Sequence, residues 1–223
     1  MSITLAFDVY GTLINTHGIV SKLMQFSVAN AEQFSQLWRD KQLEYSFRRG
    51  LMQSYENFAV CTSNALDYSC SYLGVSLSDE QKNELLTSYR RLPAFDDVIP
   101  ALQQLKNAGY NLYAFSNGTA TAVEELLTSA GISDYFLGVV SVDEIKTFKP
   151  NPATYQHFLT KSAATCSSAW LISSNPFDVI GAVSAGMKSA WVKRNSDAVF
   201  DPWGIDPTVI ISKLSELEQH VAL

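Results

Sequence analysis

The sequence predicts an α/β fold, with a doubly wound, Rossmann-like parallel sheet and an inserted all-helical domain. Three observations predict it. Residues 3–8 form an apolar run without alternation, which is typical of a strand buried on both faces of a parallel sheet. Residues 18–91 carry apolar side chains at three- and four-residue spacing, which indicates helices. After Pro93, strand-like and helix-like segments alternate, as they do in a doubly wound sheet.

The helical region separates the first strand from the rest of the predicted sheet. No strand-like run interrupts it, and we expect four or five helices there. Ser78 precedes Asp79, Glu80 and Gln81, which is a good helix start because it combines a capping oxygen with acids in the first turn. The predicted organisation is therefore a core made of residues 1–14 and 96–223, with a helical cap of residues 15–95.

The second half of the chain supplies the other predicted elements of the core. We expect Gly109 to end the first helix of this half and Thr119 or Thr121 to cap the second helix. Pro176 is expected near the first turn of the last helix. The expected elements are a helix at 98–109, a strand at 110–118, a helix at 119–131, a strand at 136–142, a helix at 151–162, a strand at 168–175, a helix at 176–186 and a last strand at 188–194.

Composition excludes several classes of partner. The 223-residue chain has a formal net charge of -6 and no long basic run, so it is unsuited to nucleic acid, whose phosphates need clustered Lys and Arg. No segment approaches the ~20 apolar residues of a membrane span. The N-terminal run lacks the basic start of a signal peptide. Three cysteines without a CxxC pair fit a reduced, cytoplasmic setting.

Polar residues gather where predicted strands end. Asp8 ends the first strand, residues 116–118 (Ser-Asn-Gly) end a second, and residues 173–175 (Ser-Ser-Asn) end a third, with Asp178 just beyond. Ligands of open α/β sheets bind at the carboxyl ends of the strands, so we expect these groups to share one crevice. Lys149, on a predicted loop, is expected beside them.

Each residue alone also has a simpler interpretation. Asn117 with Gly118 is most often just a turn. Lys149 alone is most often a surface residue, and Asp178 could be a first-turn acid favoured by the helix dipole. Asp8 is the least ordinary of the set, because Asp is rarely buried without a partner. Their shared position at strand ends favours a functional site.

Four segments resemble the haloacid dehalogenase superfamily in order and spacing: "FDVYGTL", "SNG", "KPNPATY" and "SSNPFD". The stretches "LWRDKQLEYSFRRGLM" and "AWVKRNSDAVFDPWG" resemble more narrowly its L-2-haloacid dehalogenases, and the similarity covers nearly the whole chain. The resemblance implies a hydrolase acting on short L-2-haloalkanoic acids, that is, an (S)-2-haloacid dehalogenase.

Tyr10 distinguishes this chain from the phosphatases of that superfamily. The resemblance implies that those enzymes carry a second aspartate two residues after the nucleophile and hold magnesium. Here that position is Tyr10, and Asn175 stands where the last motif would offer an acid, although Asp178 remains. A hard cation prefers several anionic oxygens. We therefore expect a site without metal or other cofactor.

The mechanism that the resemblance implies starts with Asp8, since a carboxylate can serve as a covalent nucleophile. Asp8 attacks C2 of the acid, halide leaves with inversion, and an aspartyl ester forms. Water, oriented or deprotonated by Asp178 with Lys149 and Asn175, then releases a D-2-hydroxy acid. A nearby Lys149 favours the ionised form of Asp8.

The resemblance assigns further roles around Asp8. Arg39 of the cap, Asn117 and Phe177 would cradle the halide, Ser116 the substrate carboxylate, Thr12 would brace Asp8, and Tyr155 would orient Lys149 or Asp178. The family commonly has Trp at the Phe177 position. The predicted catalytic residues are Asp8, Thr12, Arg39, Ser116, Lys149, Tyr155, Ser173, Asn175 and Asp178. The predicted substrate-binding residues are Val9, Tyr10, Arg39, Leu43, Phe58, Ser116, Asn117 and Phe177; Val9, Leu43 and Phe58 could equally be plain core.

Alternative functions are a magnesium-dependent phosphatase, a hydrolase that opens a strained ring such as that of azetidine-2-carboxylate, and a non-catalytic binding protein with the same fold. Retention of Asp8, Arg39, Lys149 and Asp178 disfavours the last. The expected partners are a 2-haloacid and water. The helices of the cap carry a surplus of apolar residues, which favours a homodimer, as the resemblance also implies.

Overall fold

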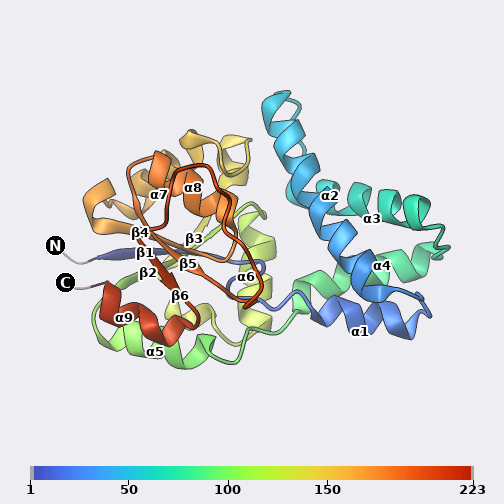
Figure 1. Cartoon of the computed structure of the whole chain (residues 1–223), viewed down its shortest axis with the longest axis horizontal. Coiled ribbons are helices and arrows are strands. Elements are labelled where there is room, and N and C mark those ends of the chain that lie inside the picture. The colour runs from blue at the N-terminus through green and yellow to red at the C-terminus, as the bar shows by residue number, and fades with distance from the viewer. Residues whose placement is uncertain (1–2, 222–223) are drawn as a thin grey trace.

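The computed structural model describes residues 3–221 and contains a six-stranded parallel sheet (Figure 1). The strand order is β3-β2-β1-β4-β5-β6, so the chain starts in the middle of the sheet and builds outward in both directions. The predicted fold class is confirmed. The strands are β1 (Thr4–Asp8), β2 (Asn111–Ser116), β3 (Gly138–Ser141), β4 (Ala169–Ser173), β5 (Lys188–Val192) and β6 (Val209–Ile211).

The prediction of a last strand at 188–194 was wrong in one respect. β5 is followed by β6 (Val209–Ile211), which pairs with it in parallel at the edge of the sheet. The segment is three residues long, and Ile210 within it is 54% exposed. Such a short run carries no periodicity that could distinguish it from a loop.

Helices cover both faces of the sheet, with α7 and α8 on one face and α5 and α9 on the other (Figure 1). Side chains of β1 alternate between the two layers: Leu5 and Phe7 join one buried cluster, whereas Ala6 joins the other. The helices of the core are α5 (Val98–Asn107), α6 (Ala120–Ser129), α7 (Pro152–Ser162), α8 (Pro176–Ser184) and α9 (Leu217–His220), with 3-10 segments η2 (Ser133–Tyr135), η3 (Val142–Ile145), η4 (Cys166–Ser168) and η5 (Leu214–Glu216).

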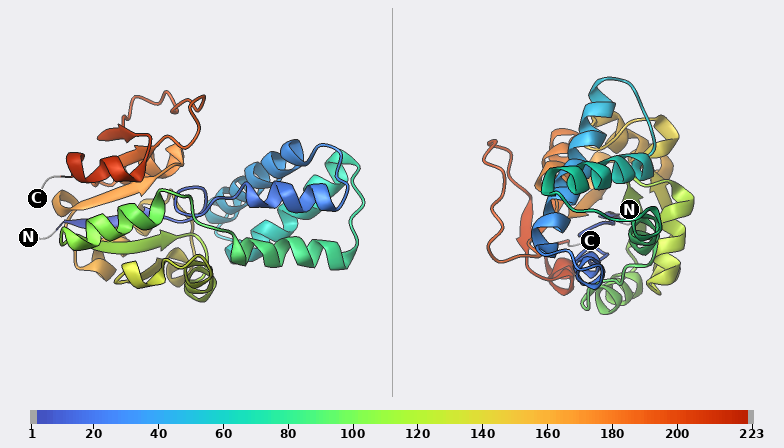
Figure 2. Two further views of the ribbon diagram at one scale, coloured as in Figure 1. Left: turned by 90° about the horizontal axis from the view of Figure 1, so that it is seen from below. Right: turned by 90° about the vertical axis from the view of Figure 1, so that its right-hand side faces the viewer.

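The cap is a separate group of helices beyond the carboxyl ends of the strands (Figure 2). Each of its three longer helices begins with a side-chain cap, from Asn30, Asn57 and Ser78. Ser78 caps its helix as the sequence predicts, and the structure adds a capping box between Ser78 and Gln81. Its elements are α1 (Gly18–Gln25), α2 (Ala31–Leu51), α3 (Phe58–Leu73), α4 (Asp79–Ser88) and η1 (Tyr89–Arg91).

Two chain segments join the cap to the core, and they pair with each other. Ile14 and Ala94 form an antiparallel bridge. The Asn15 N–H donates to Pro93 O at 2.8 Å, and the Phe95 N–H donates to Leu13 O at 3.0 Å. The outgoing segment leaves the core six residues after Asp8, so the position of the cap is coupled to the end of β1.

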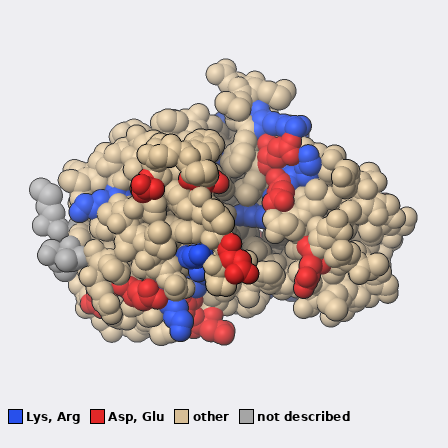
Figure 3. All heavy atoms as spheres, viewed as in Figure 1, with Lys and Arg blue, Asp and Glu red and all other residues tan. Residues whose placement is uncertain are grey.

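The face of the molecule in Figure 3 carries acidic and basic side chains interspersed, without a large basic patch. Within residues 3–221, no helix is both long and apolar enough to cross a membrane.

Candidate active site

Three neighbouring strands bring the predicted polar residues together. Asp8 ends β1, Ser116 ends β2 and Ser173 ends β4, and these strands occupy adjacent positions in the sheet. Because the strands are parallel, their carboxyl ends lie at one edge, which faces the cap. The convergence that the sequence predicts is therefore present.

Asp8 is held by three donors. Thr12 Oγ1 donates to Asp8 Oδ2 at 2.8 Å, and Asn175 Nδ2 donates to the same oxygen at 2.7 Å. Lys149 Nζ lies 3.3 Å from the other oxygen, Oδ1. Asp8 is 8% exposed, so a carboxylate with fixed orientation and a compensated charge borders the gap between core and cap.

Lys149 lies at the centre of the site and is only 1% exposed. Besides the contact with Asp8, its ammonium donates to Asp178 Oδ2 at 2.8 Å and to Phe115 O at 2.9 Å, and it lies 4.1 Å from the centroid of the Phe115 ring. The backbone N–H of Lys149 donates to Asn117 Oδ1 at 2.9 Å. The predicted loop lysine is thus a fixed cation between two carboxylates.

Asp178 lies behind Lys149 and is fully buried. Tyr155 Oη donates to Asp178 Oδ1 at 2.8 Å, so of the two partners predicted for Tyr155 the structure has Asp178. Burial raises the pKa of the Asp178 carboxyl, and the adjacent Lys149 ammonium opposes that rise. Asp178 therefore balances the charge of Lys149 and is itself enclosed by protein.

The hydroxyls at the ends of β2 and β4 organise the turns that follow. Ser116 Oγ accepts from the Gly118 N–H at 3.1 Å, and Ser173 Oγ accepts from the Asn175 N–H at 3.1 Å. Ser173 thus positions the residue that donates to Asp8. Among residues 3–221, Asn117 Nδ2 has no acceptor, so this donor is available at the cavity that Asn117 lines.

Arg39 reaches the site from α2 of the cap. Its Nη1 donates to Gln42 Oε1 at 2.7 Å, and its Nη2 donates to Tyr10 O at 3.4 Å. Gln42 is 2% exposed and donates to Thr62 Oγ1, which in turn donates to Phe58 O. A relay between α2 and α3 therefore fixes the direction of the guanidinium.

Tyr10 contributes a neutral phenol to the wall of the site. Burial raises the pKa of Tyr10 to about 12, although the charge of Arg39 opposes the rise. At neutral pH the phenol is a hydrogen-bond donor and does not replace the carboxylate acid–base group expected at this position in a phosphatase.

A cavity of about 10 Å³ lies where these groups meet, which is room for about one water molecule. A haloacid requires side chains or the cap to move when it binds. Ten side chains line this reaction cavity: Asp8, Tyr10, Arg39, Leu43, Phe58, Ser116, Asn117, Lys149, Asn175 and Phe177.

The other predicted site residues do not line the reaction cavity. Thr12, Ser173 and Asp178 contact residues that do, and Tyr155 contacts Asp178. The role of Val9 in substrate binding stays a prediction, and its side chain, which is fully buried in the hydrophobic core, does not line the reaction cavity. Successive side chains of an extended chain point in opposite directions. Because the Asp8 side chain points toward the site, the Val9 side chain points away from it.

Three residues that support the site were given no role from the sequence, although one of them, Ser174, lies in the polar cluster expected there. Gln42 holds Arg39; it lies three positions further along the same helix, a spacing that could have revealed it. Ser174 donates its backbone N–H to Thr12 Oγ1 at 2.8 Å, and Trp191 donates its indole N–H to Ser174 O at 3.1 Å. These two contacts join distant segments, and no local pattern signals them.

The carboxylates at this site are a poor match to magnesium. No group of three or more His, Cys, Asp or Glu side chains with the geometry to hold a metal occurs in residues 3–221. Asp8 and Asp178 are bridged by the Lys149 ammonium, which takes the place that a cation between them would need. A hard divalent ion prefers several anionic oxygens, and here both carboxylates are already paired with an ammonium.

The chain is similar to known proteins over most of its length. A family model described as haloacid dehalogenase-like hydrolase matches residues 4–186. An (S)-2-haloacid dehalogenase of Pseudomonas putida is 33% identical over 96% of this chain and 93% of its own. Haloacetate dehalogenase H-2 of Moraxella sp. is 32% identical over 98% and 97%. The structure of L-2-haloacid dehalogenase from Xanthobacter autotrophicus with chloropropionic acid covalently bound has a TM-score of 0.90 at 29% identity, over 97% of each chain. This chain belongs to the haloacid dehalogenase-like hydrolase family.

Proposed function

We propose that this protein is an (S)-2-haloacid dehalogenase, which hydrolyses short L-2-haloalkanoic acids to D-2-hydroxy acids. The observation that carries the proposal is the arrangement around Asp8: a fixed carboxylate, a buried ammonium beside it and a guanidinium across the cavity. The relatives named (S)-2-haloacid dehalogenase and the covalent chloropropionic acid in a similar structure support it.

Asp8 Oδ1 is the proposed nucleophile. Oδ2 already accepts from Thr12 and Asn175, whereas Oδ1 has, within residues 3–221, a single donor, Lys149, at 3.3 Å. A lone pair of Oδ1 attacks C2 of the acid, the carbon–halogen bond breaks with its electron pair leaving on the halide, and C2 inverts. Ser116 would hold the substrate carboxylate through its hydroxyl.

Arg39 is proposed to receive the departing halide, together with Asn117 and the Phe177 ring. All three line the reaction cavity, and a guanidinium presents several N–H donors to an anion. An anion leaving into a cavity of this size needs such donors, because an uncompensated charge in a dry site is costly.

Water then attacks the carbonyl carbon of the Asp8 ester and breaks its bond to Oδ1, which leaves with the product. The carbonyl oxygen at this stage is Oδ2, and the donors Thr12 and Asn175 are placed to stabilise the negative charge that develops on it. Water gives up two protons in this step. The Asp178 carboxylate is the proposed acceptor of one of them, through Lys149, which connects it to Asp8. The other goes to Oδ1, which becomes the hydroxyl oxygen of the product.

The reaction is proposed to need no metal. Tyr10 offers a neutral phenol where a second acid would bind a cation, and Lys149 already bridges the carboxylates. Activity that is lost in EDTA and restored by magnesium would favour the phosphatase-like alternative.

The proposed assembly is a homodimer in the cytoplasm, with residues 15–95 as the cap and residues 1–14 and 96–223 as the core. Leu51, Met52 and Tyr72 of the cap are exposed to 86%, 72% and 67%, which favours an interface there. Light scattering at micromolar concentration tests the dimer, and a monomer there contradicts it.

Oxygen labelling distinguishes direct attack by Asp8 from activation of water by Asp8. In a single turnover with excess enzyme in heavy-oxygen water, direct attack puts unlabelled oxygen from Asp8 into the product, and the label enters the Asp8 carboxylate. Labelled product in the first turnover, with unlabelled Asp8, excludes the covalent route. Halide release from (S)-2-chloropropionate, but not from its enantiomer, tests the substrate assignment.

A further inference from the structure

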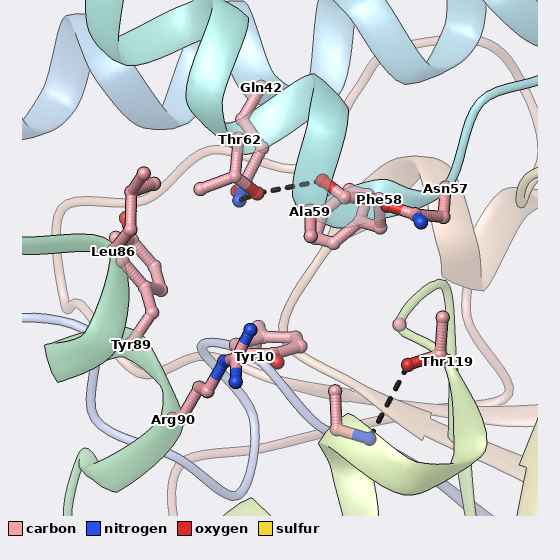
Figure 4. Close-up of a pocket in the computed structure, with 12 residues that line it drawn as sticks. Tyr10, Gln42, Asn57, Phe58, Ala59, Thr62, Leu86, Tyr89, Arg90 and Thr119 are labelled. Carbon is pink, nitrogen blue, oxygen red and sulfur yellow. Dashed lines mark hydrogen bonds between the residues drawn. The ribbon is translucent and has the colours of Figure 1, made fainter. Parts of the chain in front are cut away.

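A second, larger cavity adjoins the reaction cavity between cap and core (Figure 4). Its volume is about 290 Å³, near the lower end of cavities that bind small molecules. Tyr10 and Phe58 line both cavities, and their rings lie 6.1 Å apart. These two side chains therefore form the wall between the place where C2 of a haloacid must react and a space large enough for several further atoms.

One part of the lining of this second cavity is apolar, and another part is rich in hydrogen-bond donors. Phe58, Ala59, Leu86 and Ala122 supply apolar surface suited to methylene groups. Figure 4 shows Arg90 and Tyr10 across the cavity from Gln42 and Thr62 of the cap. No Asp or Glu lines it, although acids outnumber bases in the chain by 22 to 16.

Three of the donors have no acceptor among residues 3–221. Tyr89 is 6% exposed, and neither its phenol nor the phenol of Tyr10 is hydrogen bonded there. The Arg90 guanidinium, on the exposed side of the cavity, has no carboxylate partner. Burial raises the pKa of Tyr10 and of Tyr89 to about 12, so both phenols carry a proton to donate at neutral pH. A side chain as buried as that of Tyr89 usually has a hydrogen-bond partner for its polar group, and here a ligand in the cavity that it lines can supply the acceptor.

The N-terminus of α6 also favours a negatively charged ligand in this cavity. Thr119 and Ala122 of its first turn line the cavity, and Thr119 caps the helix by accepting from the Ala122 N–H. A helix N-terminus favours negative charge. The donors, the single cation and the absence of lining acids all indicate an anionic group bound at the end of an apolar stem.

We propose that this cavity binds the side chain of the substrate beyond C3 and selects 2-haloacids whose side chain ends in a second carboxylate, that is, 2-halo dicarboxylic acids. The inference rests on the proposed dehalogenase function, because it places C2 of the same molecule at Asp8. Arg90, Tyr89 and Tyr10 donate to the second carboxylate, and Phe58 and Leu86 contact the methylene chain.

Two acids of equal length test the proposal: (S)-2-chlorohexanedioate, with a terminal carboxylate, and (S)-2-chlorohexanoate, with a terminal methyl group. We expect kcat/KM for halide release to be about tenfold higher for the dicarboxylate, as suits a charge-assisted contact. The Arg90→Gln variant should bring this ratio close to one, and Tyr89→Phe should reduce it about threefold. Arg91→Gln is the matched control, because Arg91 is the exposed neighbour in η1 and does not line the cavity; it should keep the ratio.

A ratio at or below one in the unmodified protein, or a ratio that Arg90→Gln leaves unchanged, overturns the proposal. Calorimetric titration with hexanedioate and hexanoate, which have no halogen, separates this failure from failure of the proposed function. Tighter binding of hexanedioate that depends on Arg90 supports the cavity assignment even if (S)-2-chloropropionate releases no halide. Equal binding of both acids in the unmodified protein and in Arg90→Gln contradicts it.

Discussion

Lys149 Nζ lies 2.8 Å from Asp178 Oδ2, and the two side chains are buried to 1% and 0% exposure. A pair of this kind is costly to break, because one charge is left behind in a place that water does not reach. The Asp178→Asn variant should lose about 3 kcal/mol of unfolding free energy and most of its turnover. Urea unfolding and halide release measure the two effects.

Tyr155→Phe is the matched control for Asp178→Asn. It removes one hydrogen bond to the same carboxylate and keeps the ion pair, so we expect a loss of about 1 kcal/mol. If Asp178→Asn costs no more than Tyr155→Phe, the buried pair does not contribute as its geometry indicates.

Arg39 provides a test of the halide cradle. Arg39→Ala removes a charge-assisted donor worth about 1.5–3 kcal/mol, which corresponds to a roughly tenfold to hundredfold lower rate of halide release. Arg48→Ala, on an exposed part of the same helix, is the control and should keep full activity. Unchanged turnover in Arg39→Ala, with unchanged stability, would mean that Arg39 is only a surface residue of the cap.

Tyr55 and Asp143 connect cap and core in a way that depends on pH. Tyr55 Oη, in the segment after α2, donates to Asp143 Oδ1 at 2.5 Å, and Lys146 Nζ lies 3.0 Å from the other oxygen. Partial burial would raise the pKa of Asp143, but the hydrogen bond from Tyr55 and the Lys146 ammonium outweigh it and lower the pKa below its ordinary value of 3.8. The ionised carboxylate is therefore favoured in the folded state.

The stability from this contact should be complete above the ordinary pKa of an aspartate and should disappear as pH falls through the lower pKa of the folded state. Tyr55→Phe keeps the ring stacked on Phe148 and removes the donor. We expect it to cost about 1 kcal/mol at pH 6 and less at pH 3, by urea unfolding at both values. A larger cost at pH 3 than at pH 6 would contradict the direction of the shift.

How far the sequence predicts the structure depends on whether a feature is local. The strand of Asp8, the helix cap at Ser78 and the helix cap at Thr119 follow from short patterns, and the structure contains all three. Of the two caps the sequence allows for α6, Thr119 is the one used, because its side chain accepts from the N–H three residues later.

Features that depend on contacts between distant segments were not predicted. β6 forms because β5 offers it an edge, and its three residues carry little signal of their own. Ser174 holds Thr12 across 162 positions of the chain. The donors Tyr89 and Arg90 face a cavity that exists only once cap and core are assembled. The roles proposed for the individual site residues stay predictions that the variants here can test.

Arg194 links the two segments that join cap and core. Its Nη1 lies 2.8 Å from both carboxylate oxygens of Asp97, just after the returning segment. Its Nε and Nη2 donate to Thr12 O at 3.2 and 2.7 Å. Thr12 lies just before the segment that leads from the core to the cap. The guanidinium also lies 4.3 Å from the centroid of the Phe95 ring. One side chain therefore ties both segments to the residue that holds Asp8.

Arg194→Met should lower both stability and turnover. It leaves the partly buried Asp97 carboxylate with the Leu214 N–H as its remaining donor and should cost about 2 kcal/mol of unfolding free energy. Because Thr12 Oγ1 donates to Asp8 Oδ2, a less firmly held Thr12 should also lower kcat more than it raises KM. Lys193→Met, the adjacent lysine with no carboxylate partner in the described residues, is the control and should change neither. Urea unfolding and steady-state halide release measure both quantities, and a variant that loses stability but keeps kcat would limit Arg194 to holding the two segments together.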